Sequence, residues 1–376
     1  MIPSPEGSIA VTLTRRGDAL SEVAIHSTRP HLAHKLLHGR DPVDAARIVG
    51  VIFSLCGRAQ RVACEAACEV ANEVAASTEP ARQAERARAV LLEMAREHAW
   101  RVLVNWPEQV GLPTDMATLL RINQAANKAP DGFAEVLAAC LSEVMLGEVP
   151  ETWLARDLAG FEAWCAAAAT PTAVSFAALP QSAEGASVTC PLLPGLRELA
   201  DVAVLALARQ VLDDPGIEAR PLWHGQPAET GACARLRDTP LLAAWLATHG
   251  RGVGARMLAR LIELASIPAR LRTADTGDLL RAWRIAPDTG VAGVETSRGL
   301  LLHVVRLEAG KIADYRIVAP TEWNFHPAGP LWEALAGLPA TGDLAARARL
   351  LAQSLDPCVD YRVEVRDDPL AGISHA

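Results

Sequence analysis

Several common signatures of function are missing from this chain of 376 residues. It contains no Cys-x-x-Cys pair, so the usual spacings of zinc and iron–sulfur sites are absent. Its longest apolar stretches, around Arg47–Gly57 and Leu199–Ala208, are far shorter than the roughly 20 residues that a membrane span requires. The first residues show neither the basic nor the apolar segment of a secretory signal. We therefore expect neither a membrane span nor a signal peptide.

The charge and the cysteine content narrow the functional classes that remain for this protein. With 36 basic and 44 acidic side chains the formal net charge is −8, and no long basic run occurs, which argues against nucleic-acid binding. Eight cysteines are scattered along a chain that shows no secretory signal, so reduced thiols in the cytoplasm are expected. Burial in the core is the default expectation for four of them, Cys140, Cys165, Cys190 and Cys233.

Hydrophobic periodicity predicts an α+β fold that is mainly helical. Two segments rich in β-branched residues, Ser8–Arg15 and Ala19–Ser27, flank Gly17-Asp18 and predict an N-terminal β-hairpin. Helical patterns follow, and the longest begins at Pro42 behind Asp41, a candidate N-cap. The helices predicted in this block are His31–Leu37, Pro42–Ala76, Ala81–Val104, one opening at Pro113-Thr114, Phe133–Met145 and Trp153–Ala168.

The second half of the chain changes its pattern. A looser stretch, Ala169–Pro191, precedes predicted helices at Leu192–Leu212, Leu241–His249, Gly254–Ala265, Pro330–Ala336 and Leu344–Ser354. Between these helices, Val291–Glu295, Leu300–Glu308 and Ile312–Pro320 predict an antiparallel β-meander, with Ala309-Gly310 as a turn. We expect a single domain, divided into a β-hairpin (1–30), a helical block (31–170), a variable helical region (171–272), the meander (273–327), and C-terminal helices with an Asp-Pro-Cys segment (328–376).

Three places carry unusual combinations of polar residues. They are Leu37–Pro42 followed by Ser54–Gly57, then Val294–Gly299 continuing to His303 and on to Pro320–Asn324, and finally Ser354–Cys358. Taken singly, each has an ordinary explanation. A cysteine in an apolar helix is commonly a small buried hydrophobe.

Three further groups of residues have an ordinary interpretation, and for two of them a metal site is an alternative. Cys64 and Cys68 share one helical face, which suits either a metal clamp or core packing. His31, His34 and His38 also share a face, which suits either a metal relay or a solvated surface. Glu295 and Arg298 fit an ordinary surface ion pair. Residue types alone therefore leave the function open.

In this order, the three places resemble the large subunit of [NiFe] hydrogenases. That family carries RGFEKLLEGRDP leading to RxCGxC, a central EAPRG followed by PTTWN, and a C-terminal DPCxxCxxH. The corresponding segments here are His31–Pro42 with Cys56-Gly57, Glu295–Gly299 with Thr321–Asn324, and Asp356–Cys358. The resemblance covers both ends and the meander, whereas about residues 100–270 carry no matching motif. It implies a large-subunit-like fold with a central helical bundle.

The departures from the family pattern are selective. Ala59 and Tyr361 stand where the second cysteine of each pair is expected, and Glu364 replaces the terminal histidine. His34 replaces the glutamate that the family uses for proton transfer. Two thiolates cannot supply the four soft ligands of a nickel–iron site, so we expect neither nickel nor hydrogen turnover.

The retained residues form a coherent subset. By resemblance, Arg298 and Thr321 lie around the diatomic ligands of iron, with Asp356 facing the arginine, although Ser297 replaces the family proline. Cyanide on iron accepts hydrogen bonds, for which a guanidinium and a hydroxyl are suitable donors. The candidate metal ligands are Cys56 and Cys358, expected as thiolates with pKa values lowered by metal and nearby positive charge, and further candidates are Cys64 and His34.

The pattern is similar to hydrogenase expression/formation proteins of the HupK/HoxV type. This resemblance implies a cytoplasmic, non-enzymatic scaffold or chaperone that helps assemble an iron unit with cyanide and carbonyl ligands. The implied partners are maturation chaperone and scaffold proteins of the HypC/HypD kind and the immature large subunit. Two alternatives stay open: a metalloenzyme that uses Cys56, Cys358 and His34, and a metal-free mimic of the large subunit that binds the chaperone.

C-terminal processing is not expected. Large subunits lose an extension after the histidine of DPCxxCxxH. Here that histidine is replaced by Glu364, and the sequence ends at Ala376. We expect the chain to remain intact to Ala376 by mass spectrometry.

Overall fold

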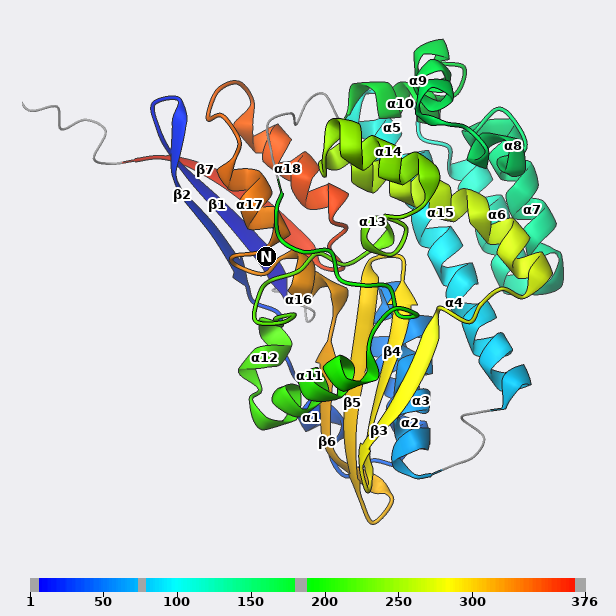
Figure 1. Cartoon of the computed structure of the whole chain (residues 1–376), viewed down its shortest axis with the longest axis vertical. Helices are drawn as coiled ribbons and strands as arrows, with labels where there is room; N and C mark the ends of the chain where they lie inside the picture. Colours follow the sequence, from blue (N-terminus) through cyan, green and yellow to red (C-terminus); the bar gives the residue numbers. More distant parts are fainter. Residues whose placement is uncertain (1–6, 74–78, 180–187, 369–376) are drawn as a thin grey trace, which may run out of the picture.

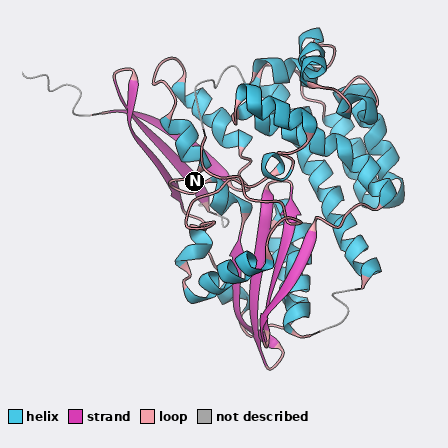
Figure 2. Ribbon diagram, viewed as in Figure 1, coloured by secondary structure: helices cyan, strands magenta, loops and turns pink. Residues whose placement is uncertain are grey.

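Two β-sheets and a bundle of helices make up the fold (Figure 1; Figure 2). The computed structural model describes residues 7–73, 79–179 and 188–368. One sheet has four strands and lies against helices from both halves of the chain, while the other joins the two ends of the chain. The bundle lies on the opposite side of the molecule from the smaller sheet (Figure 1).

Four antiparallel strands form the larger sheet in the order β3-β4-β5-β6. The strands and their covering helices are β3 (Leu280–Ala286), β4 (Thr289–Thr296), β5 (Gly299–Glu308), β6 (Lys311–Val318), α3 (Gly57–Ala71), α11 (Asp201–Asp213) and α12 (Gly216–Ala219). Helix α3 covers one face, and α11 and α12 lie on the other (Figure 1). Burial on both faces explains why β4 and β5 are almost continuously apolar. The predicted meander is thus present, and its first strand, β3, escaped prediction because its charged, partly exposed residues lack that apolar run.

The smaller sheet has the order β2-β1-β7. The predicted hairpin is present as β1 (Ser8–Arg16) and β2 (Ala19–Ser27), and β7 (Asp360–Asp367) pairs with β1 in parallel. Strand β7 was not predicted, because the C-terminal segment was expected to contain only helices and the Asp-Pro-Cys segment. The predicted helices α17 (Pro330–Ala336) and α18 (Leu344–Ser354) pack against this sheet.

The prediction of one continuous helix from Pro42 to about Ala76 is wrong. The chain forms α1 (Ala33–Leu37), α2 (Pro42–Ile52), a 3₁₀ turn η1 (Ser54–Cys56) and then α3. Helices α2 and α3 fold back on each other so closely that a Cβ at Gly57 would collide with the carbonyl oxygen of Gly50. This tertiary contact breaks the helical pattern at Cys56. Asp41 occupies the N-cap position of α2, although its side chain makes no capping hydrogen bond.

The helical bundle surrounds α15 (Val253–Thr273), whose buried face includes the charged residues Arg256, Arg260 and Glu263. Two helices expected to be continuous pass instead into π-helical turns, one at Arg101–Asn105 and one at Leu141–Met145. The other elements are α4 (Pro80–Trp100), α5 (Trp106–Gln109), α6 (Met116–Lys128), the 3₁₀ turn η4 (Pro130–Gly132), α7 (Phe133–Cys140), α8 (Pro150–Leu154), α9 (Leu158–Ala167), α10 (Pro171–Ala178), α13 (Ala232–Arg235), α14 (Pro240–His249) and α16 (Pro320–Asn324).

The region before α11 differs from the prediction of a helix over Leu192–Leu212. The helix begins only at Asp201, because Pro194 interrupts the pattern and the preceding residues run irregularly. Leu192 instead forms a parallel β-bridge with Glu229. The predicted loose stretch contains α10, and its residues 180–187 lie outside the described part of the chain, as does the end of the helix predicted to reach Ala76. In the described ranges, no helix combines the length and apolarity that crossing a bilayer requires.

The Gly50–Gly57 contact can be tested by substitution. We expect Gly57→Ala to lower the free energy of unfolding by roughly 1–3 kcal/mol, because an added methyl must push α2 and α3 apart. Urea denaturation measures this difference. Gly132→Ala is the matched control, since nothing lies within 4 Å of the added methyl. Equal losses for the two variants would contradict the proposed close approach.

Candidate functional site

A cavity of about 280 Å³ lies between α1, α2 and η1 on one side and β5, β6 and α16 on the other. Its walls are mainly apolar. Four residues singled out by the sequence motifs, Cys56, Arg298, Thr321 and Cys358, line this one cavity although they are far apart in the sequence. The structure therefore brings the three motif segments together.

Cys56 sits at the N-cap of α3, where η1 ends. The side-chain amide of Gln60 donates to its sulfur over 3.6 Å. Burial raises the pKa of Cys56 to about 12, with Glu93 and Cys358 adding to the effect, whereas Arg298 acts in the opposite direction. The expected lowering of this pKa by positive charge is thus outweighed by burial in the unmetallated protein.

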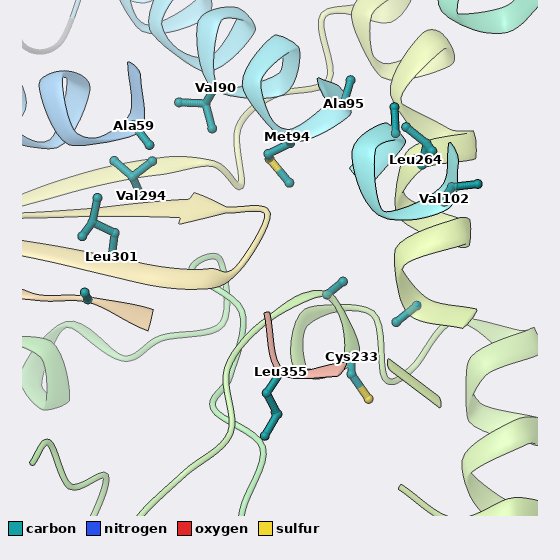
Figure 3. Close-up of a cluster of buried hydrophobic side chains, with 14 of the residues drawn as sticks. Ala59, Val90, Met94, Ala95, Val102, Cys233, Leu264, Val294, Leu301 and Leu355 are labelled. Atoms are coloured by element: carbon teal, nitrogen blue, oxygen red, sulfur yellow. The ribbon is translucent and has the colours of Figure 1, made fainter. Parts of the chain in front are cut away.

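Glu93 of α4 caps the N-terminal end of α3. Its carboxylate accepts hydrogen bonds from the backbone N–H groups of Arg58 and Ala59, at 2.8 and 3.2 Å. Burial raises the pKa of Glu93 to about 7, although these two bonds favour the ionised form. Ala59, which stands in place of a family cysteine, is fully buried in the apolar cluster with Val294 and Leu301 (Figure 3).

Cys358 lies between α18 and β7, and its sulfur accepts two hydrogen bonds. Nη1 of Arg29 donates over 2.6 Å and Oγ1 of Thr321 over 3.0 Å. Nε of Arg29 lies 2.7 Å from Oε1 of Glu322, which is buried in α16. Sequence reasoning missed Arg29. The available signal was Glu322 itself, because a carboxylate that replaces a neutral residue of the motif and is buried needs a cationic partner.

Arg298 lies in the tight turn between β4 and β5. Oγ1 of Thr296 accepts from the backbone N–H groups of Arg298 and Gly299, which fixes the turn. Nη2 of Arg298 donates to Glu97 over 2.7 Å, and Nε lies 3.6 Å from Asp356. Within the described chain, Nη1 of this buried guanidinium has no hydrogen-bond acceptor.

Asp356 is almost fully buried and has a left-handed backbone with a φ of 57°. Arg101 pairs with one carboxylate oxygen, which Arg298 also approaches, and Arg260 lies 3.8 Å from the other oxygen. Burial alone would raise the pKa of Asp356, but these three guanidinium groups hold it well below its ordinary value. The expected charge pair with Arg298 is present, and Arg101 and Arg260 are additional partners that the sequence did not reveal.

Other motif residues have structural roles. The side chain of Asn324 accepts from the N–H of Thr230 and donates to its carbonyl oxygen, both over 3.0 Å, which pins α16 to the neighbouring loop. Glu295 is buried and pairs with Arg235 at 3.0 Å. The interpretation of Glu295 and Arg298 as a surface ion pair is therefore wrong, because the two side chains point into different buried networks.

His34 and Cys64 do not join the cavity lining. Nδ1 of His34 contacts the carbonyl oxygen of His31, and Cys64 lies in the core beside Tyr315. Among the residues the structure describes, no cluster of three or more His, Cys, Asp or Glu side chains could hold a metal ion. Of the four cysteines left without a role, three are buried and one is half-buried: Cys140, Cys190 and Cys233, and then Cys165.

Comparison with known proteins identifies the family of this chain. Over 368 residues, the chain is 32% identical to the hydrogenase expression/formation protein HoxV of Cupriavidus necator, covering 90% of this chain and 92% of that protein. It is also 32% identical to HupK of Rhizobium leguminosarum bv. viciae, covering 96% and 97% of the two chains. The chain belongs to the HoxV/HupK family of hydrogenase expression/formation proteins.

The same family shares its fold with hydrogenases. Residues 248–361 match the pattern of nickel-dependent hydrogenases. The Ni-Fe-Se hydrogenase of D. vulgaris Hildenborough superposes with a TM-score of 0.59 at 16% identity, over 92% of this chain and 95% of that one. The predicted α+β, large-subunit-like fold is thereby confirmed.

A buried chain of hydrogen bonds runs from Cys56 through Gln60 and His303 to Tyr315. Oε1 of Gln60 lies 2.8 Å from Nε2 of His303, and Nδ1 of His303 lies 2.5 Å from the hydroxyl of Tyr315. Burial lowers the pKa of His303 to about 3, so the ring is neutral at pH 7. A neutral ring that accepts at Nδ1 donates at Nε2, which orients the Gln60 amide to present its N–H groups to Cys56.

The titration of His303 predicts a pH-dependent stability term. An unfolded histidine takes up a proton near pH 6.5, whereas His303 in the folded protein resists protonation down to about pH 3. The contribution of neutral His303 is therefore complete above pH 6.5 and is lost as the pH falls. We expect the stability gap between wild type and His303→Gln to narrow by about 1 kcal/mol per pH unit below pH 6 in urea denaturation. Parallel stability profiles for the two proteins would contradict this assignment.

The Asp356 cluster gives a second prediction. Asp356→Asn removes the carboxylate among three guanidinium groups, so we expect a loss of about 3–5 kcal/mol in the free energy of unfolding. The exposed pair Arg121–Glu143 supplies the control, because Glu143→Gln should change stability by less than about 1 kcal/mol. Similar values for both variants in urea denaturation would show that Asp356 is not a central ion-pair partner.

Proposed function

We propose that this protein acts in hydrogenase maturation by carrying, or helping to assemble, an iron unit with cyanide and carbonyl ligands for the immature large subunit. The observation that carries the proposal is the shared cavity, which joins two cysteine sulfurs to a buried guanidinium and a hydroxyl. The names of its relatives, hydrogenase expression/formation proteins, support a role in maturation.

The chemistry of the cavity suits such a cargo. Thiolates are soft ligands for iron, and Cys56 and Cys358 offer two of them. Because Oγ1 of Thr321 lies 3.0 Å from the Cys358 sulfur, it is close to any metal that this sulfur binds. Cyanide is an anionic acceptor for Thr321 and Arg298, and the apolar walls suit carbonyl ligands, which accept hydrogen bonds weakly.

The same residues do not fit a nickel–iron turnover site. Ala59 and Tyr361 provide no soft ligand at the second position of either cysteine pair. Ala59 is enclosed by apolar side chains (Figure 3), and Tyr361 belongs to β7, where it pairs with Ile9 of β1. We therefore propose a carrier without hydrogenase activity and with no resident nickel.

Partner binding follows from the surroundings of the cavity. Leu32, Leu36, Ile52 and Leu55 line it and are each 38–44% exposed. Exposed apolar residues grouped around a site commonly mark an interface. We propose that maturation chaperone and scaffold proteins of the HypC/HypD kind, and the immature large subunit, contact this rim in the cytoplasm.

Infrared spectroscopy tests the cargo. Protein purified without oxygen from cells with the maturation machinery should show cyanide and carbonyl bands, and Cys56→Ala or Cys358→Ala should lose them by more than tenfold. Thr321→Val should keep the bands but shift the cyanide frequencies, because one donor is lost. Cys165→Ala, a half-buried cysteine that does not line the cavity, is the control and should leave the spectrum unchanged.

The other outcomes separate the alternatives. A wild-type protein without these bands that still binds its maturation partners would favour a metal-free mimic. Hydrogen-dependent dye reduction by the isolated protein would establish an enzyme and overturn the carrier proposal.

A further inference from the structure

The two cysteines of the cavity raise a question of selectivity, because a pair of thiolates attracts many divalent cations. The guanidinium group of Arg29 contacts the sulfur of one of these cysteines, Cys358. The Arg29 side chain is 11% exposed, and its Nη1 is 2.6 Å from the Cys358 sulfur. The carboxylate of Glu322, whose side chain is 4% exposed, holds the same guanidinium at 2.7 Å. A buried cation therefore occupies one side of the sulfur.

We propose that the Arg29–Glu322 pair is a specificity determinant that keeps bare divalent cations, nickel among them, from binding to Cys56 and Cys358. This inference rests on the proposed role of the two cysteines as ligands. A divalent cation that binds Cys358 shares the sulfur with the hydrogen bond from Arg29 and also approaches Arg298, the second guanidinium in the cavity wall. These two guanidinium groups repel a divalent cation at Cys358, and the carboxylates of Glu322, Glu97 and Asp356 that pair with them offset this repulsion in part.

The same charges act differently on an iron unit that carries cyanide. Its outer atoms are anionic acceptors, so guanidinium groups that repel a bare cation attract the ligand shell. The cavity thus discriminates by the sign of the charge that the cargo presents. Cysteine geometry alone cannot make this distinction, since both kinds of cargo bind sulfur.

The sequence also indicates that Arg29 and Glu322 act as a pair. Position 322 carries glutamate, whereas the hydrogenase motif PTTWN has threonine there. A neutral residue at this position would leave Arg29 buried without a carboxylate, and Glu322 without Arg29 would be an isolated buried anion. Arg29 and Glu322 therefore depend on each other, and the departure from the motif places a cation at the sulfur.

The test replaces both charges together. Arg29→Met/Glu322→Thr leaves no unpaired buried charge, and the metal-free, reduced protein is titrated with Co²⁺ alone under anaerobic conditions. Thiolate-to-cobalt absorption reports ligation, and equilibrium dialysis repeats the measurement with Ni²⁺. We expect the double variant to bind both ions at least tenfold more tightly than wild type. Adding Cys358→Ser should abolish the gain.

Three further variants sharpen the result. Arg29→Lys keeps a cation and should retain the weak binding of wild type, which a merely structural role for Arg29 does not predict. Arg121→Met/Glu143→Thr removes an exposed pair of the same charges and should leave binding unchanged. Should the double variant fail to fold, Arg29→Gln/Glu322→Gln, a neutral polar pair, provides the comparison, with a change expected in the same direction.

Equal affinities in wild type and the double variant, whether weak or tight, would overturn the proposal. Binding by Arg29→Lys as tight as that of the double variant would also overturn it. These titrations contain no iron cargo, so they are independent of the infrared test. Missing cyanide and carbonyl bands would contradict only the proposed carrier function. Unchanged cobalt binding would contradict only the proposed specificity role.

Discussion

The burial of Asp356 among three arginines is the constraint on which the site depends. Arg101 comes from the π-helical turn after α4, Arg260 from α15, and Arg298 from the β4–β5 turn. One carboxylate therefore connects the bundle, the larger sheet and the C-terminal segment. Isolated buried charges are costly, so Asp356 depends on these arginines, whereas Arg298 also has Glu97 as a partner. The cluster thereby restricts how the three segments can meet.

This arrangement explains how the two ends of the chain reach one cavity. Asp356 lies two residues before Cys358, and Nη2 of Arg260 also donates to the carbonyl oxygen of Ser354 at the end of α18. The chain then enters β7, which pairs with β1 of the hairpin, so Cys358 is held from both sides. Arg29 follows the end of β2 and meets the cysteine there.

The local sequence could predict part of this structure. Arg298, Thr321 and Asp356 belong to short motifs, and their proximity followed from resemblance. The break at Cys56 did not, because it depends on the contact between Gly50 and Gly57 and not on helix propensity. Strand β7 could not be placed for a similar reason, since its parallel partner lies near residue 10. Long-range ion pairs such as Arg29 with Glu322 leave only a weak sign in sequence: a charge in an apolar setting.

Retention of one cysteine from each pair has a consequence for transfer. A carrier must release its cargo to a recipient, so the recipient has to bind more tightly. Under the proposed function, a recipient with all four cysteines can go on to bind nickel beside the iron unit, which Cys56 and Cys358 alone cannot do. In the proposed carrier, Arg298 and Thr321 donate hydrogen bonds to the ligand shell without forming metal–sulfur bonds, so they provide recognition without preventing release. On the two proposals taken together, loss of the second cysteines favours delivery in one direction, and the buried cations select the cargo.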